Sequence, residues 1–480
     1  MTSVQTIPSE ILSAIFRLIL GKPPLELHTI RLLAHHRARV RKLVKLSLVC
    51  RRWRITVLGD GTLWRTLPID TSRSDCQEST TAVLERSKHA MLDVSIMCDD
   101  ELDCPHEAIF SEISRNFDRI KSLHFATTSP GTLRNLSTPA LKLETLNIFT
   151  AEQSAELGFL FGGSLPALRS LTLAGVPSWP LGLFSNLKDL RLVLPPSHPT
   201  VKVSSLIDVM SRSPGIEQIK MSAFLSMIDD SPPSCLVSLP NLQRFTMRNC
   251  DSVMVLSHTI IPAAADIKVV MDHCRMRTTM HIPSRDCHIL CSIPEDMSTM
   301  GFLAESTMFV LQQDRKIGFG IGFYQSHSSR PSLRILDRST SASVDLFSRR
   351  SIEALASRPH QFKNTTDLSI KLFAGTTVPW STLLCCFRRL ERLSMVAAHA
   401  PSILSALMVI GEDSHPICPA LRQLNIHEKD GHAVVLDKDD MVRFFATRRV
   451  LNCAATEVNV YGLGGRKRWK YGNGQMDARY

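Results

Sequence analysis

The clearest pattern along the chain is a short motif, apolar-x-x-apolar-x-apolar, that recurs from residue 120 onward. The first six copies begin 23, 25, 19, 29 and 26 residues apart. Alternate residues of such a motif point to one side of a β-strand, and a return at this interval is typical of repeat arrays. The pattern therefore predicts a row of short strands joined by helices or turns. These copies are Ile120/Leu123/Phe125, Leu143/Leu146/Ile148, Leu168/Leu171/Leu173, Leu187/Leu190/Leu192, Ile216/Ile219/Met221 and Leu242/Phe245/Met247.

The motif loses its spacing between residues 250 and 360, where strands are still expected at 267–271 and 332–336. A helix is predicted at 437–449 and a final strand at 458–460, while the glycine-rich, basic end from residue 462 is predicted to be disordered. We interpret the middle of the chain as irregular or inserted repeats. Further copies of the motif are Thr365/Leu368/Ile370, Leu390/Leu393/Met395 and Leu421/Leu424/Ile426.

The first 70 residues follow a different, helical pattern. Ser9 is expected to cap a helix that Gly21 ends. A second helical pattern runs from Leu43 to Trp53, and a short apolar segment follows at 63–69. A domain of ~60 residues cannot bury so many large apolar side chains, so part of this surface should meet a partner or the next domain. The apolar residues expected on one face of the first helix are Ile11, Leu12, Ile15, Phe16, Ile19 and Leu20.

Three segments in this region, in their order and kind, resemble the F-box motif: Ile7-Pro8-x-Glu10-Ile11-Leu12, Val49-Cys50-Arg51-Arg52-Trp53-Arg54 and Leu63-Trp64. Two departures are Ile7 in place of the more usual leucine and a longer gap between the motif halves. F-boxes bind the Skp-type adaptor of Skp–cullin–F-box ubiquitin ligases, and through it a cullin. The resemblance implies that the adaptor interface is formed or supported by Pro8, Ile11, Leu12, Ile15, Leu46, Val49, Cys50 and Trp53.

An F-box followed by loosely spaced leucine-rich units resembles large F-box families of higher fungi. The expected fold class is α/β, with a small helical F-box followed by a leucine-rich-repeat-like solenoid of short parallel strands and helices. We interpret the basic insertion at 21–42 as a solvated extension of the second helix, with a membrane-surface or calmodulin-binding segment as the alternative. The predicted divisions are an F-box domain at 1–70, a linker and first helical or capping segment at 71–115, the irregular solenoid at 116–461 and the basic tail at 462–480.

Composition and charge indicate the cellular compartment of the protein. Lys and Arg outnumber Asp and Glu by 56 to 45 in 480 residues, for a net charge of +11, and the excess gathers at 31–54 and 466–470. The start of the chain lacks a signal-peptide pattern, and no apolar run reaches the ~18 residues of a membrane span. Thirteen cysteines without a paired framework suit a reducing compartment. We expect an intracellular protein of the cytoplasm and/or nucleus, without a membrane segment.

A search for catalytic and ligand-binding motifs finds none that the spacing supports. The run Gly318–Phe323 lacks the Gly-x-Gly-x-x-Gly spacing of a phosphate-binding loop and reads as a strand. Neither cysteine and histidine set has paired Cys-x-x-Cys spacing, so no metal or cofactor is expected. These two sets are Cys98, Cys104 and His106, and His273, Cys274, Cys287, His288 and Cys291.

The combined pattern predicts a non-catalytic substrate-recognition subunit of a Skp–cullin–F-box ubiquitin ligase, in which the solenoid binds an unknown protein target. The alternative is a leucine-rich-repeat scaffold without ligase association, which would require the apolar face of the F-box to pack against the first repeats. Nucleic acid is not the expected partner because only four tyrosines are available for base stacking. The sequence singles out no substrate-binding residue.

Overall fold

The computed structural model describes two compact units, Met1–Ser234 (unit 1) and Cys235–Tyr480 (unit 2). The description leaves out residues 1–6, 22–28, 99–105, 129, 152–156, 158–159, 195–200, 223–224, 227–235, 249–254, 263, 272–305, 315–317, 325–330, 338–350, 356, 358–361, 363, 373–377, 412–413, 429–437, 455, 463–464, 473–474 and 480. Among the described helices, none combines the length and the apolar content needed to cross a membrane.

Unit 1 begins with a helical module, which we call the N-terminal module. It consists of α1 (Ser9–Leu20), α2 (Thr29–Ser47), α3 (Arg51–Gly59) and the 3₁₀ turn η2 (Gly61–Trp64). Pro8, and not the predicted Ser9, occupies the N-cap position of α1. The single helical pattern predicted from Leu43 to Trp53 is two helices, because the chain turns after Ser47 and Cys50 is extended (φ −159°, ψ 168°) at the N-cap of α3.

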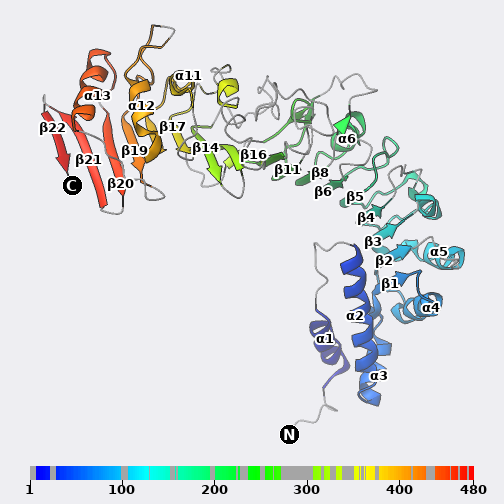
Figure 1. The fold of residues 1–480 in the computed structure, drawn as a ribbon. Coiled ribbons are helices and arrows are strands. Elements are labelled where there is room, and N and C mark those ends of the chain that lie inside the picture. Colours follow the sequence, from blue (N-terminus) through cyan, green and yellow to red (C-terminus); the bar gives the residue numbers. More distant parts are fainter. Residues whose placement is uncertain are drawn as a thin grey trace. The chain divides into compact units, whose positions relative to one another are not determined.

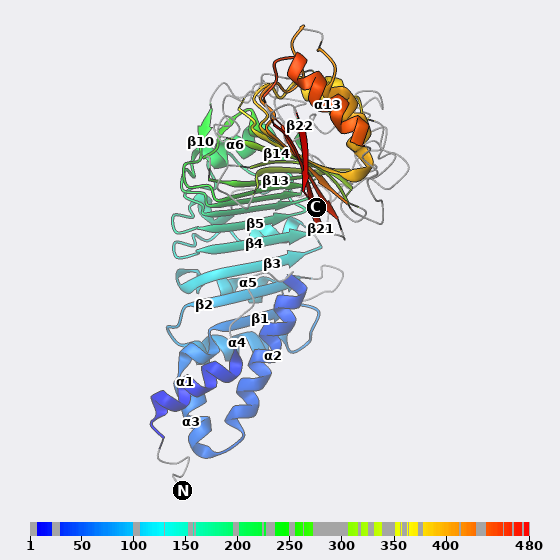
Figure 2. The ribbon, with the colours of Figure 1, turned by 90° about the vertical axis from the view of Figure 1, so that its left-hand side faces the viewer.

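A parallel sheet follows the module in unit 1, and each strand pairs with the next in the order β1-β2-β3-β4-β5-β6-β8. Figure 2 shows the strands lying one above another. Helices and turns connect them, and β7 and β9 form a separate short parallel pair. The bounds are β1 (Thr66–Asp70), α4 (Cys76–Ser87), β2 (Leu92–Cys98), α5 (His106–Ser114), η3 (Phe117–Arg119), β3 (Ile120–Thr127), η4 (Pro130–Asn135), β4 (Thr145–Thr150), η5 (Leu160–Gly163), β5 (Ser170–Ala174), β6 (Asp189–Val193), β7 (Val201–Lys202), α6 (Val203–Ser211), β8 (Gln218–Ser222) and β9 (Leu225–Ser226).

The core of unit 1 lies on the side of the sheet covered by α4 and α5, and α2 lies on the opposite face of the first strands (Figure 1). The second and third apolar residues of each motif point to the core side and are fully buried, as at Leu146 and Ile148 in β4. The registers align these residues from strand to strand, for example Leu146 with Leu171 and Leu171 with Leu190. Each strand thus extends one continuous apolar layer.

Unit 2 contains a mixed sheet in the order β11-β13-β16-β15-β14-β17-β18-β19-β20-β21-β22. The strands are parallel except around β15 and from β20 to β22. Its elements are β10 (Val237–Ser238), β11 (Arg244–Arg248), β12 (Thr259–Ile260), β13 (Asp266–Met271), β14 (Met308–Asp314), β15 (Gly318–Tyr324), β16 (Pro331–Asp337), β17 (Asp367–Lys371), α11 (Trp380–Cys385), β18 (Arg392–Val396), η8 (Ala397–His399), α12 (Ala400–Leu407), β19 (Gln423–His427), α13 (Lys438–Val450), β20 (Glu457–Gly462), β21 (Gly465–Gly472) and β22 (Gln475–Arg479).

The structure confirms the predicted α/β class, with a helical N-terminal region followed by a mostly parallel sheet with helices. Every copy of the apolar motif lies at a strand, and Gly318–Phe323 lies in β15. The motif loses its spacing after residue 250 because β14, β15 and β16 are joined in antiparallel pairs, which need no helical crossover. Phe309, Phe323, Phe362 and Phe387 cluster there, with neighbouring rings 4.9–6.2 Å apart.

Two parts of the chain differ from the expected organisation. The first strand, β1, already lies inside the range predicted as F-box, and β2 lies inside the range predicted as a linker. The tail was expected to be disordered, but it contributes the antiparallel strands β21 and β22. Backbone groups on the edge of β20 would otherwise lack partners in the sheet, and β21 supplies them.

Gly175, at the end of β5, offers a test of this packing. Its φ is +76°, and a Cβ at this position would lie 2.1 Å from the carbonyl oxygen of Thr150. The Thr150 hydroxyl also donates a hydrogen bond to the Gly175 carbonyl (2.8 Å). We expect Gly175→Ala to lower the free energy of unfolding by about 2 kcal/mol or more, measured by urea denaturation of the full chain. Gly215→Ala is the matched control because nothing lies within 4 Å of its Cβ position, and equal stability of the two variants would contradict the described turn.

Candidate functional site

The N-terminal module has a complete apolar core of its own. Leu12, Phe16 and Leu20 of α1 are buried, as are Leu63 and Trp64 of the η2 turn. The rings of Phe16 and Trp53 meet edge to face, with centroids 5.0 Å apart. The indole N–H of Trp64 donates to the Val57 carbonyl oxygen (2.8 Å), so the buried tryptophan has its polar atom satisfied.

Polar contacts fix both ends of α1 against the rest of the module. At its start, the Arg52 guanidinium of α3 donates a hydrogen bond to the carbonyl oxygen of Ile7. At its end, Arg17 pairs with Asp60 (2.8 Å) and donates to the Thr62 hydroxyl (3.0 Å). The turn between α2 and α3 therefore lies beside the start of α1, and the η2 turn lies beside its last turn.

The outer side of α1 is apolar as well. Ile11, Ile15, Leu18 and Ile19 are exposed at spacings i, i+4, i+7 and i+8, which form one stripe along the helix. Leu18 is 82% exposed. The six residues predicted to share one face are thus divided between two stripes, with Leu12, Phe16 and Leu20 in the core and Ile11, Ile15 and Ile19 outside.

Exposed aliphatic residues continue on the other two helices. Val44 lies near the end of α2, Leu48 and Val49 form the turn, and Ile55 and Leu58 lie on α3. We call the exposed residues of α1, α2, the turn and α3 the apolar surface of the module. Scattered exposed aliphatic residues are ordinary, but a concentration of nine in one small module is typical of an interaction surface. Its members are Ile11, Ile15, Leu18, Ile19, Val44, Leu48, Val49, Ile55 and Leu58.

The structure places the predicted adaptor-binding residues in three environments. Pro8, Ile11, Ile15, Val49 and Cys50 are exposed, with Ile11 at 53% and Val49 at 60%. Leu46 and Trp53 are half-buried, whereas Leu12 is 1% exposed and belongs to the core.

Sequence reasoning assigned no interface role to six further exposed residues, Leu18, Ile19, Val44, Leu48, Ile55 and Leu58. For Leu18 and Ile19 the signal was present in the sequence, because α1 is apolar around most of its circumference.

Helix α2 joins the module to the sheet. Leu32, Leu33, His36, Arg39 and Leu43 along it are buried, so the interpretation of residues 29–42 as a solvated extension is wrong for this side of the helix. The reason is tertiary, since α2 packs on β1 and β2 as well as on α3. A helix that covers a sheet buries the side facing it whatever the charge of its other side.

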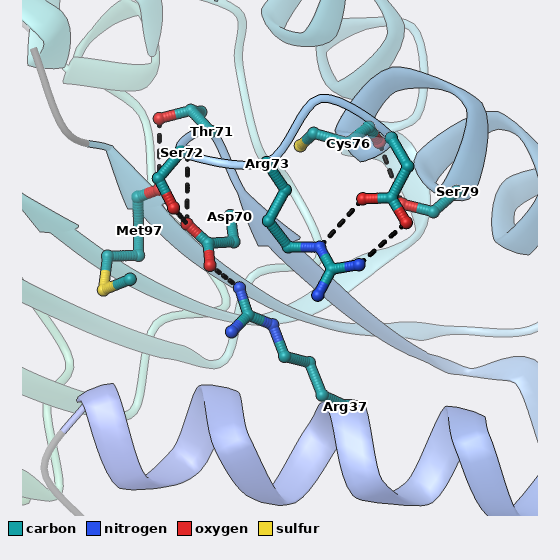
Figure 3. A network of polar contacts seen from close by, with 9 residues as sticks. Arg37, Asp70, Thr71, Ser72, Arg73, Cys76, Ser79 and Met97 are labelled. Atoms are coloured by element: carbon teal, nitrogen blue, oxygen red, sulfur yellow. Dashed lines mark hydrogen bonds and ion pairs between the residues drawn. The ribbon is translucent and has the colours of Figure 1, made fainter. Parts of the chain in front are cut away.

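Polar contacts orient α2 on the sheet. The Arg37 guanidinium pairs with the Asp70 carboxylate at the end of β1, and Figure 3 shows this pair at the centre of a local network. Asp70 also accepts from the Ser72 hydroxyl (2.7 Å), and the Thr71 N–H donates to the Met97 carbonyl oxygen of β2 (3.1 Å). Farther along α2, the Arg39 guanidinium donates to the Gly21 carbonyl oxygen (2.8 Å).

His36 is held neutral at this contact. Its Nδ1 lies 2.7 Å from the Ser95 hydroxyl of β2, and its side chain is almost fully buried. Burial first, and then nearby His124, His35, Arg39 and Arg65, lower the pKa of His36 from its ordinary 6.5 to about 3.

In the described part of the chain, no group of three His, Cys, Asp or Glu side chains is placed to hold a metal ion. Cys98 ends β2 and His106 begins α5, while Cys104 between them lies outside the described residues. The second candidate set, at 273–291, also lies outside them.

The burial of His36 predicts a loss of stability in acid. Below pH 6.5 the unfolded chain binds a proton at this imidazole that the folded chain does not, so the free energy of unfolding falls from pH 6.5 toward 3. We expect the wild type to lose up to about 1.4 kcal/mol more per pH unit than His36→Gln, measured by urea denaturation between pH 7 and 5. Identical slopes for wild type and His36→Gln would contradict the neutral, buried state.

Comparison with known proteins gives a single assignment. Residues 4–69 match a protein-family model described as F-box-like. The matched range contains α1, α2, α3, η2 and most of β1, so the helices that carry the apolar surface all fall inside it. No curated protein matches the chain at a significant level. The N-terminal region is therefore an F-box-like domain, which occupies a small part of the chain.

Proposed function

We propose that this chain is the substrate-recognition subunit of a Skp–cullin–F-box ubiquitin ligase. The apolar surface of the N-terminal module binds a Skp-type adaptor and through it a cullin, and the sheet holds the protein target. The observation that carries the proposal is the coincidence of the F-box-like match with nine exposed aliphatic residues on a module whose core is already filled. Such a surface is stabilised when a partner covers it.

An adaptor interface of this kind has a recognisable scale. Stable protein–protein interfaces bury about 1,600 Å² in total, with an apolar centre and a polar rim. A few well-packed anchors near the centre of such an interface supply most of the affinity. The exposed side chains Ile11, Ile15 and Val49 suit the role of anchors, whereas Leu12 supports the interface from within the core.

The alternative of a scaffold without ligase association requires the apolar surface to pack against the first repeats. In the described part of unit 1, α2 covers the sheet with its opposite, buried side, and the exposed side chains of the module remain accessible. This arrangement favours the ligase subunit over the scaffold without ligase association.

The proposed subunit is not itself an enzyme. A receptor of this type raises the effective concentration of a target lysine near the ubiquitin-conjugating partner, and this requires no catalytic side chain in the receptor.

We propose that the sheet of unit 1 consists of divergent leucine-rich repeats. Each repeat contributes one short strand with buried aliphatic residues, and each strand pairs in parallel with the one before it. We propose that the strand face opposite the core, which α2 covers only at β1 to β3, is the target surface.

Two rows of side chains cross this face in register. One row is apolar and runs along the carboxyl-terminal ends of the strands, and the neighbouring row is polar and carries positive charge at β6 and β8. A protein segment lying across the strands would meet both. The apolar row is Met97, Ala126, Phe149, Ala174 and Val193. The polar row, beyond the strands that α2 covers, is Asn147, Thr172, Arg191 and Lys220.

Adaptor binding is tested directly with the double variant Ile11→Asp, Val49→Asp. Two carboxylates at the centre of an apolar interface would have to lose their hydration, so we expect affinity for a purified Skp-type adaptor to fall at least about 100-fold. The measurement is isothermal titration calorimetry. Leu12 is unsuitable for this purpose because an aspartate there would disrupt the core.

The matched control for this experiment is Leu141→Asp, Leu181→Asp, which adds the same charges at exposed leucines of unit 1 outside the module. Circular dichroism should show all three proteins folded. Wild-type protein that fails to bind the adaptor, or a double variant that binds as tightly as the control, would contradict the proposal.

The target surface is tested separately with Val193→Asp, an exposed position of the apolar row. We expect this variant to bind the adaptor as the wild type does but to lose its target. In cells that contain only the variant, proteins that accumulate on depletion of this chain should accumulate as well, measured by quantitative proteomics. Leu181→Asp serves as the control. If the target proteins are turned over normally in the Val193→Asp cells, this strand face is not the target surface.

A further inference from the structure

The second and third helices of the module carry an unusual distribution of charge. Between Thr29 and Gly59 the sequence contains nine Lys and Arg and no Asp or Glu. Uncompensated charge of one sign on two neighbouring helices creates a positive potential over that surface. The F-box resemblance accounts for the apolar residues of these helices but not for this excess.

Four of these cations have hydrogen-bond or ion-pair partners within unit 1. Arg37 pairs with Asp70, and Arg39 donates to the Gly21 carbonyl oxygen. Arg52 donates to the Ile7 carbonyl oxygen, and the Nε of Arg54 donates to the Ser47 carbonyl oxygen (3.2 Å). All four contacts lie within unit 1 and hold its elements together.

The remaining cations are exposed, and none has a hydrogen-bond or ion-pair partner among the residues that the structure describes. A solvated cation makes no net contribution to the fold that would account for it, and five like charges in one small module oppose one another. We call them the free cations of the module: Arg31, Arg41, Lys42, Lys45 and Arg51.

Three of the free cations share helix stripes with the apolar surface. On α2, Arg41 and Lys45 lie at i and i+4, with Val44 beside them. Leu48 follows in the turn, where its N–H donates to the Lys45 carbonyl oxygen (3.1 Å). On α3, Arg51, Ile55 and Leu58 lie at i, i+4 and i+7. Residues at these intervals are neighbours on one side of a helix, so the charges and the aliphatic side chains belong to one contact surface.

We propose that the partner of the module presents an apolar groove flanked by carboxylates, so that its acidic side chains meet Arg41, Lys45 and Arg51 while the groove covers Leu48, Ile55 and Leu58. This inference rests on the proposed function, since the partner concerned is the Skp-type adaptor, and it defines the adaptor's chemistry. Complementary charge at the edge of an apolar interface accelerates association and fixes the orientation of the two proteins.

The composition of the surface favours a protein partner over nucleic acid. Its exposed large apolar residues are all aliphatic, while Trp53 is half-buried and Trp64 is buried. Single-stranded nucleic acid is bound largely by stacking of bases on aromatic rings, which this surface lacks. Nucleic acid and anionic lipid are the contrasting outcomes of the test.

The test uses the full chain and a purified Skp-type adaptor in a surface plasmon resonance experiment at 50 and 500 mM NaCl. The variant is R41Q/K45Q/R51Q, and the control is R115Q/K142Q/K202Q, which removes three exposed cations of unit 1 outside the module. We expect the wild-type association rate to fall about tenfold between the two salt concentrations. The variant should associate about tenfold more slowly at 50 mM and depend little on salt, while the control follows the wild type.

The outcomes separate the two hypotheses. If the variant associates at the wild-type rate with the same salt dependence, the charge inference is wrong and the ligase function stands. If the folded wild-type chain does not bind the adaptor at either salt concentration, the proposed function fails. Binding of the wild type, but not the variant, to phosphatidylserine vesicles or single-stranded RNA would then assign the free cations to another partner and overturn the inference.

Discussion

The packing of α2 against two partners at once is the constraint on which unit 1 depends. One part of this helix covers the first strands of the sheet, and the other belongs to the three-helix module. His36 and Arg39 are polar and buried, and each has a hydrogen-bond partner, while the half-buried Arg37 pairs with Asp70. Burying them without these partners would cost several kcal/mol, so the position of α2 on the sheet is specified as well as stabilised.

This arrangement leaves no free linker between the module and the first strand. The chain passes from the η2 turn at Trp64 to β1 at Thr66, and the buried ring of Trp64 anchors that passage. A surface on the module and a surface on the unit 1 sheet are consequently held in a fixed relation by α2. In the proposed ligase subunit, a fixed relation between the two surfaces would preserve the effective concentration of a bound target near the catalytic partner.

The free cations and the apolar surface illustrate a division between stability and function. Trp64 and Asp70 stabilise unit 1, and both are buried with their polar atoms hydrogen-bonded. Ile11, Val49 and Arg51 contribute little to the fold because they remain in water. Their concentration on one module is therefore explained more simply by a partner than by folding.

The sequence by itself determined the repeating strands, the helical start and the block of positive charge, because each depends on local periodicity or composition. It did not determine which stripe of α1 is buried, that α2 covers the sheet, or that the tail adds strands to β20. Those outcomes depend on surfaces that residues far apart in the chain bring together. Leu12 and Ile11 are equally apolar neighbours, and only tertiary packing distinguishes the core residue from the candidate interface residue.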